Sequence, residues 1–203
     1  IGTGPFTFQR WEPSQYLILK RFDNYYSDKP SIEKVLLKII PDNNTSLISL
    51  KKQEIYSSSL RAKDFPKFEK NTTFNTFRYY DLMYTYMAMN LKNPLFQNPS
   101  IRKALAMLID KEAIVNGIFK GYAKRADIPT SPELWTYPKK IVTYPNNIKK
   151  AKALFKKAGY IYDEKTQKLV HQNTKKPFHF TLITNKGNKD REKATELIEQ
   201  NLA

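Results

Sequence analysis

The two histidines, His171 and His179, are the first residues to test for chemistry, because imidazole serves both in acid–base catalysis and in metal binding. Neither has a second histidine at HxxxH or HExxH spacing. No GxSxG sequence is present to place a serine nucleophile on a sharp turn. We therefore expect no catalytic residues, no metal site and no cofactor, and the sequence favours a protein that is not an enzyme.

Two further patterns could carry chemistry. Asp163 and Glu164 lie in the turn-like sequence YDEKTQK, which favours a solvated turn over an acid–base pair. The sequence ITNKGNKDRE, residues 183–192, places a glycine and a lysine before a helix, where a phosphate could bind. It lacks the GxxxxGK[ST] pattern, so we interpret it as a plain strand-to-helix loop.

Aromatic and hydroxyl side chains form the remaining candidate set. They are Tyr79, Tyr80, Tyr84, Tyr86, Ser57, Ser58, Ser59, Tyr122, Trp135 and Tyr137. Side chains of these types are suited to adaptable recognition of small ligands. Core packing is the alternative for each aromatic residue considered alone.

The first 90 residues are predicted to form a mixed sheet with short helices. A turn at Pro13 joins two β-rich runs in a hairpin, and the apolar run VLLKII, residues 35–40, indicates a buried strand. Asn44 is the expected N-cap of a short helix that carries Leu47, Ile48 and Leu50. A helical turn is expected around Pro66, and further strands are expected at residues 54–60, 74–80 and 83–90.

Residues 91–203 are predicted to be α/β as well. Apolar side chains at helical spacing predict helices over residues 101–109 and 148–158, with Gly159 as a left-handed C-cap. Asp110 is the expected N-cap of a further helix that ends near Gly121. A long loop with four prolines follows, and loops of this length tend to be functional. A strand is expected over residues 177–185, and a last helix begins at Lys189.

The sequence NLKNPLFQNPS, residues 90–100, lies between these two parts. Asn93-Pro94 and Asn98-Pro99 bias the residue before each proline away from helix, so the chain is expected to stay extended until Ser100. We predict a domain boundary here, with residues 1–90 in one unit and 91–203 in the next.

Composition limits the class of protein. Hydrophobic residues make up 40% of the 203 residues, enough for a folded core, and cysteine is absent, which removes disulfides and thiol nucleophiles. No run of about 18 apolar residues occurs. The net charge is +16, and residues 91–203 hold 22 Lys and Arg against 10 Asp and Glu. This balance raises the prospect of an anionic partner such as nucleic acid, but the lysines are scattered along amphipathic helices, which favours solvated faces.

Several segments together resemble one family. GTGPFTFQRWEPSQYLILKRFDNYYSDKPSIEKVLLKIIPDNNTSLISLKKQEI, MAMNLKNPLFQNPSIRKALAMLIDKEAIVNGIFKGYA and KKAKALFKKAGY, followed by TLITN, resemble successive segments of the bacterial extracellular solute-binding proteins of family 5. These are the oligopeptide-, dipeptide- and nickel-binding receptors of ABC importers. Gln53 replaces the usual glycine and Tyr56 the usual aspartate, and SSSLRAKDF leaves the ligand type open.

The resemblance implies a type II periplasmic-binding-protein-like α/β fold with two lobes joined by a hinge. Residues 1–90 would form the central part of the first lobe, and residues 91–203 the first half of the second lobe. The chain is then expected to be a piece of a longer protein that binds ligand poorly alone. The stretch around Asn90 would be a hinge crossing, where a few residues absorb the backbone change as the lobes close.

The resemblance also implies where a ligand would bind. The corner after Glu54-Ile55 matches Tyr56, Ser57, Ser58 and Ser59, and the hinge strand matches Tyr84, Tyr86 and Asn90. The loop after Gly121 suggests Ser131, Pro132 and Trp135. The implied partners are a peptide ligand and the membrane subunits of an ABC permease, with an extracytoplasmic location, either periplasmic or as a cell-surface lipoprotein. A nickel complex or another small solute is the alternative ligand, and a basic nucleic-acid-binding module is the alternative function.

Overall fold

The structure is a computed structural model, and it describes residues 2–202. The chain divides into two compact units, which meet in the sequence between Leu60 and Arg61. The predicted lobe boundary between residues 90 and 91 refers to the lobes of a larger protein and stays a prediction.

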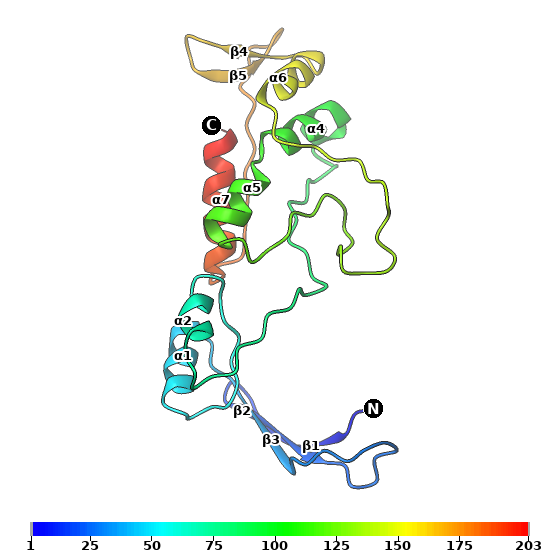
Figure 1. The fold of residues 1–203 in the computed structure, drawn as a ribbon. Helices are drawn as coiled ribbons and strands as arrows, with labels where there is room; N and C mark the ends of the chain where they lie inside the picture. Colours follow the sequence, from blue (N-terminus) through cyan, green and yellow to red (C-terminus); the bar gives the residue numbers. More distant parts are fainter. Residues whose placement is uncertain (1, 203) are drawn as a thin grey trace. The chain divides into compact units, whose positions relative to one another are not determined.

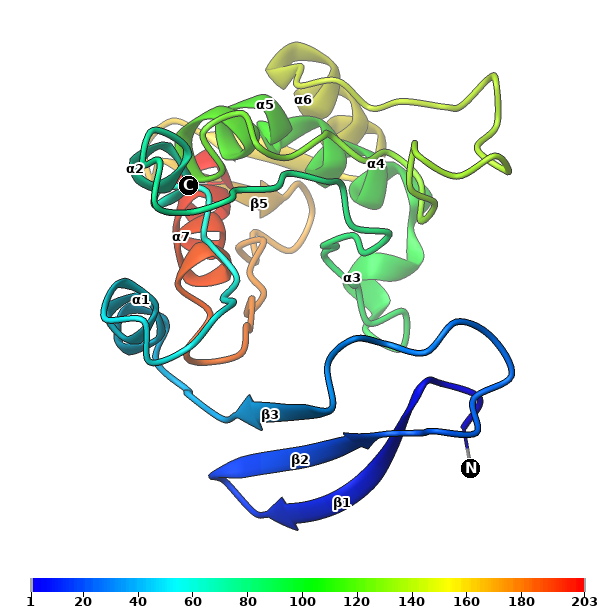
Figure 2. The ribbon, with the colours of Figure 1, turned by 60° about the horizontal axis from the view of Figure 1, so that its bottom comes forward.

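The first unit is built on a three-stranded antiparallel sheet, β1-β2-β3 (Figure 2). Strand β1 spans Phe6–Glu12, β2 spans Tyr16–Arg21 and β3 spans Lys34–Lys38. The predicted hairpin is confirmed, since Phe6 pairs with Arg21 and Trp11 with Leu17 across a turn in which Ser14 has a φ of 62°. The predicted strand at VLLKII is confirmed as β3, but the expectation that it is buried is wrong, because Leu36 and Leu37 are 58% and 47% exposed. An apolar strand is buried only when another layer of structure packs on its face, and no element among residues 2–60 packs over Leu36 and Leu37.

Helix α1, Asn43–Lys51, follows the sheet. Leu47 and Leu50 are buried as expected, but the N-cap is Asp42 and not Asn44. The carboxylate of Asp42 accepts hydrogen bonds from the backbone N–H of Thr45 at 2.8 Å and from its hydroxyl at 2.9 Å. Two donors on one residue explain why the helix begins two residues earlier than predicted.

The second unit is mainly helical, with one β-hairpin (Figure 1). Its elements are α2 Phe65–Glu69, α3 Pro94–Gln97, α4 Pro99–Leu108, α5 Lys111–Ala113, the π-helical turn η1 Ile114–Ile118, α6 Ile148–Lys157, β4 Tyr160–Asp163, β5 Lys168–His171 and α7 Lys189–Leu202. The predicted helices around Pro66, over 101–109 and over 148–158 are confirmed, and Asp110 caps α5 by accepting from Ala113 N–H at 2.9 Å. The β4–β5 hairpin was not predicted, although its turn contains the YDEKTQK sequence.

Helices α4 and α6 pack against each other to form the core of this unit. Its fully packed members are Phe96, Ile101, Ala104, Leu105, Ala151 and Phe155. The edges of aromatic rings close the core, with the Phe155–Phe178 centroids 5.2 Å apart and the Phe96–Phe180 centroids 5.4 Å apart. Helix α6 ends at Lys157, and Gly159 follows it with a φ of +87° that favours glycine, as the sequence predicts.

Four strand predictions are wrong. Residues 54–60, 74–80 and 83–90 form no ladder with any described residue, and residues 177–185 contribute only an isolated bridge between Val170 and Pro177. A β-strand requires a neighbouring strand that pairs with its backbone N–H and C=O groups. A sequence of alternating apolar and polar residues requires only that one side of the chain is buried and the other is exposed. Phe178 and Phe180 meet the core while His179 is exposed, so the alternation is present without a sheet.

The connector at residues 90–100 forms two successive helix starts. Asn93 and Asn98 are extended, with ψ of 120° and 116°, as expected for residues before proline. Each side chain caps the helix that follows, Asn93 accepting from Leu95 N–H and Asn98 from Ser100 N–H. The expectation of an extended chain up to Ser100 is therefore wrong, because α3 already occupies Pro94–Gln97 and α4 begins at Pro99.

Candidate ligand-binding site

An exposed aromatic segment, residues 77–86, is the first component of the candidate site. Tyr84 and Tyr86 are 41% and 71% exposed, and their ring centroids lie 5.5 Å apart with the planes tilted by 42°. Alternate residues of an extended chain project to the same side, so the two rings form one platform. Flat apolar faces with free hydroxyls at the rim can cover a ligand and still offer polar contacts.

The second component is the long loop after η1, and two contacts join it to the aromatic segment. Lys124 Nζ lies 4.1 Å from the ring centroid of Tyr80 and also forms an ion pair with Glu133. The guanidinium of Arg78 lies 5.7 Å from the ring centroid of Tyr122. The structure thus brings together two segments that are about 45 residues apart in sequence, and spacing alone gives no signal of this.

The base of this loop is fixed by Asp127, whose side chain is only 7% exposed. Its carboxylate accepts hydrogen bonds from Lys111 Nζ at 2.6 Å and from Arg125 Nε and Nη2 at 2.8 and 3.0 Å. Burial alone would raise the pKa of Asp127, but the hydrogen bonds from Arg125 and Lys111 outweigh it, and the pKa is lowered. The same hydrogen bond raises the pKa of Arg125. Asp127 therefore stays charged and ties the loop to the start of α5.

The loop residues that the sequence singles out have different environments. Ser131 is buried, and its hydroxyl accepts a hydrogen bond from Glu133 N–H at 3.3 Å, so it shapes a turn. Trp135 is 94% exposed. Only Trp135 presents a large surface that a ligand could cover.

The serine corner, residues 56–59, belongs to the first unit. Tyr56 is fully exposed, whereas the hydroxyl of Ser58 lies 2.8 Å from that of Ser46 on α1. Asn43 donates from Nδ2 to the carbonyl of Ser59 at 3.4 Å. Among the described residues, its Oδ1 is buried without a hydrogen-bond partner. Asn43 and Ser46 thus hold this corner in place, and the sequence analysis missed both.

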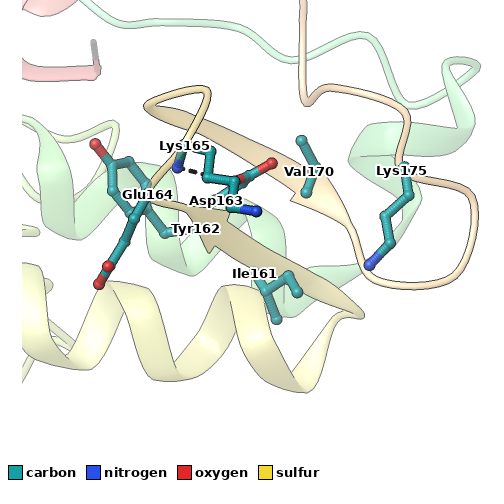
Figure 3. A pocket seen from close by; sticks show the side chains of 7 residues that line it. All are labelled: Ile161, Tyr162, Asp163, Glu164, Lys165, Val170 and Lys175. Atoms are coloured by element: carbon teal, nitrogen blue, oxygen red, sulfur yellow. Dashed lines mark hydrogen bonds between the residues drawn. The ribbon is translucent and has the colours of Figure 1, made fainter.

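Two surface hollows lie elsewhere in the second unit. One, of about 420 Å³, is formed by the β4–β5 hairpin and is lined by Ile161, Tyr162, Asp163, Glu164, Lys165, Val170 and Lys175 (Figure 3). The other, of about 310 Å³, is lined by Pro94, Leu95, Asn98, Ile101, Ala158, Tyr160 and His171. No residue of the predicted site lines either hollow, and both are open to solvent, so we do not place the site in them.

Residues 2–202 contain no group of three His, Asp or Glu side chains that could hold a metal ion. None of the helices described in this range is both long and apolar enough to cross a membrane.

Comparison with known families decides the classification. The model of the bacterial extracellular solute-binding proteins, family 5, matches residues 1–203. The chain belongs to this family.

This family member is similar to the oligopeptide-binding protein AppA of Bacillus subtilis, with 36% identity over 204 residues. The match covers 100% of this chain and 37% of AppA. The structure of AppA in complex with a nonapeptide aligns with a TM-score of 0.81 at 35% identity, covering 98% of this chain and 40% of that one. The chain thus spans well under half the length of the relatives it matches.

Two other solved structures are also similar to this family 5 chain. DppA from Helicobacter pylori, in complex with the peptide STSA, aligns with a TM-score of 0.70 at 29% identity, covering 78% of this chain and 31% of that one. NikZ from Campylobacter jejuni aligns with a TM-score of 0.84 at 24% identity, covering 98% and 40%. At that identity NikZ supports only the fold, which is the type II periplasmic-binding-protein α/β fold expected from the sequence.

In this family 5 chain the predicted site residues fall into separate groups. Tyr84 and Tyr86 lie together, and the contacts of Tyr80 and Lys124 connect their segment to the loop with Ser131 and Trp135. Tyr56, Ser57, Ser58 and Ser59 lie in the other unit. The side chain of Asn90 accepts from Lys92 N–H at 3.0 Å, so its oxygen is already used in a turn. The role of all these residues in binding stays a prediction.

Proposed function

We propose that this chain is part of the substrate-binding component of an ABC importer, which captures peptides and delivers them to a permease. The observation that carries the proposal is the exposed pair of rings of Tyr84 and Tyr86, whose segment contacts the loop that carries Trp135 through Tyr80 and Lys124. The peptide complexes of AppA and of the Helicobacter DppA support a peptide as the ligand class.

In this proposal the ligand lies in a cleft between two lobes, one containing residues 1–90 and the other residues 91–203. The turn at Asn90 and the capped starts of α3 and α4 are the proposed hinge crossing. Closing of the lobes around the peptide would bury it, and a ligand favours closure only as far as it binds the closed state better. No covalent step is involved, so the protein acts as a receptor and not as an enzyme.

Peptide backbones carry a donor and an acceptor on each residue, which matches a site lined by hydroxyls and backbone groups. Tyr86 would cover side chains of the peptide, and Tyr56 with the serine corner would supply hydroxyls, all from the lobe that contains residues 1–90. Trp135 would cover the peptide from the other lobe. A nickel complex or another small solute is the alternative ligand of the same fold.

The proposed location is outside the cytoplasm, in the periplasm or on the cell surface as a lipoprotein, as expected for a protein that feeds an importer.

Native mass spectrometry of the full-length protein, purified gently from a bacterial host, tests the proposal. We expect extra mass in a ladder of peptide sizes, because receptors that hold the peptide backbone accept many side chains. A single small adduct would instead assign a defined solute. A protein that carries nothing, ignores added peptides and binds an oligonucleotide at low salt would overturn the receptor proposal.

A further inference from the structure

Helix α6 carries an unusually one-sided set of charges. Its ten residues include five lysines and no acidic residue. At 3.6 residues per turn the lysines fall within an arc of about 160°. We call Lys149, Lys150, Lys152, Lys156 and Lys157 the lysine face, and all five are exposed.

The opposite face of α6 explains why the lysine face points to solvent. Ala151 and Phe155 are buried against the α4 side of the core. None of the ion pairs formed between described residues uses a lysine of this face. The five positive charges are therefore not neutralised by intramolecular ion pairs within the described chain.

The β4–β5 hairpin extends the positive surface. Residues 148–176 contain nine lysines against only Asp163 and Glu164. Asp163 is occupied within its own turn, where it accepts from Lys165 N–H at 2.9 Å. The hairpin is joined to the helix by Lys152, whose Nζ lies 5.2 Å from the ring centroid of Tyr162. Figure 3 shows Tyr162 and the hairpin turn beside the helix.

Apolar groups stand at the margin of the same surface. Tyr162 is 43% exposed and Ile148, at the start of α6, is 56% exposed. Tyrosine is enriched at the level of lipid headgroups, where its ring is apolar and its hydroxyl is hydrated. The apolar face of α6 is packed in the core, so the surface that can meet a bilayer consists of the lysines with Ile148 and Tyr162 at their margin, and clustered lysines are attracted to anionic lipids.

We propose that the lysine face, together with Tyr162, docks the protein on a membrane surface that contains anionic phospholipids. Lysine is a compact charge on a flexible stem, which suits a partner whose negative charges have no fixed positions, whereas structured phosphate recognition favours arginine, and α6 contains none. A bilayer is also the partner that the proposed function brings close, since a permease lies in one, and the choice of partner rests on that function. The electrostatic attraction falls off within about 8 Å at physiological salt, so docking requires close approach.

Co-sedimentation of the full-length protein with protein-free vesicles tests this inference. The vesicles contain phosphatidylglycerol and phosphatidylcholine in one set and phosphatidylcholine alone in the other. We expect binding to the anionic vesicles only, and replacing all five lysines of the face by glutamine should weaken it at least about tenfold. Raising salt from about 50 mM to about 0.3 M should weaken wild-type binding steeply.

A matched variant separates the face from overall charge. Replacing Lys29, Lys52, Lys63, Lys67 and Lys70, all exposed, by glutamine removes the same charge elsewhere and should leave vesicle binding within about twofold. Arginine at the five face positions should retain binding. Equal losses in both glutamine variants, or no wild-type binding to anionic vesicles, would overturn the proposal. Binding that appears only when permease is present in the vesicles would assign the face to a protein partner and would overturn it too.

Peptide affinity of the same variants distinguishes this inference from the proposed function. We expect it to be unchanged, because the lysine face contains no residue of the candidate ligand site. If wild-type protein binds peptide but not anionic vesicles, the docking proposal is overturned and the proposed function stands.

Discussion

Lys124 lies over the ring of Tyr80, with Nζ 4.1 Å from the ring centroid, and it also pairs with Glu133. One lysine thus connects the aromatic segment to the loop that carries Trp135. Contacts of this kind contribute little to stability when they are exposed, because water screens them. Their consequence is positional, since they fix where the loop stands relative to Tyr84 and Tyr86.

Replacing Tyr80 by leucine should weaken peptide binding by the full-length protein about threefold to tenfold, because Lys124 and its loop lose their contact with the aromatic ring. The free energy of unfolding should fall by less than about 1 kcal/mol. Isothermal titration calorimetry and urea denaturation measure the two quantities. Tyr26→Leu, at an exposed tyrosine of the first unit, is the control. Equal affinities for Tyr80→Leu and wild type would remove the loop from the site.

Tyr86→Ala should weaken peptide binding about tenfold and leave folding intact, because the ring is 71% exposed, lies outside the core cluster of the described residues and would be covered by ligand. Peptide titration followed by tryptophan fluorescence measures the affinity, and circular dichroism follows folding. Tyr26→Ala removes a ring that is 80% exposed and should not change the affinity. If Tyr86→Ala binds as tightly as wild type, the platform is not part of the site.

Asp127→Asn should lower the free energy of unfolding by about 2 kcal/mol at pH 7, because Lys111 and Arg125 would lose the buried charge that both contact. Urea denaturation of the full-length protein measures this. Asp28→Asn, at an exposed aspartate, is the control and should change the free energy by less than about 0.5 kcal/mol.

The same variant predicts a pH dependence. The pKa of Asp127 is lower in the folded state than in the unfolded state, so its contribution is fully present above the unfolded value of about 3.9. It is lost as the pH falls through the folded value. The difference between wild type and Asp127→Asn should therefore be constant from pH 7 to pH 5 and shrink below about pH 4. A difference that instead shrinks between pH 7 and pH 5 would contradict the lowered pKa.

Leu105→Ala should destabilise the second unit by about 3 kcal/mol, because the side chain is 1% exposed at the contact of α4 with α6 and its loss leaves a cavity. Leu91→Ala removes the same atoms from a leucine that is 55% exposed and should cost less than about 1 kcal/mol. Thermal denaturation of both variants tests the assignment of the core. Similar melting temperatures would mean that the α4–α6 contact is not the core.

Helices were predictable where the signals for the helix, its apolar spacing and its caps, lie within or next to its own sequence. In α4 and α6 the apolar spacing predicts both helices and Gly159 marks the end of α6, and both predictions are confirmed. The N-cap of α1 was not predictable in this way, because Asn44 and Asp42 are equally suitable residue types. Asp42 is the observed cap because it accepts two hydrogen bonds from Thr45.

Strands were less predictable because a strand depends on a partner far away in the sequence. The aromatic alternation of residues 74–90 describes two environments for its side chains, and it contains no information about which backbone pairs with it. The candidate site has the same limit. Tyr84 and Tyr86 could be chosen by type, whereas the Tyr80–Lys124 contact depends on how the chain folds back and has no sequence signature.

The exposure of β3 has a consequence for association between molecules. In the described sheet β3 is an edge strand, and Leu36 and Leu37 form an apolar pair beside unpaired backbone groups, which is a template for edge-to-edge aggregation. Lys34 and Lys38 bracket this pair on both sides. Positive charges at such positions repel a second identical edge, so the strand carries its own gatekeepers against self-assembly while the protein is being made.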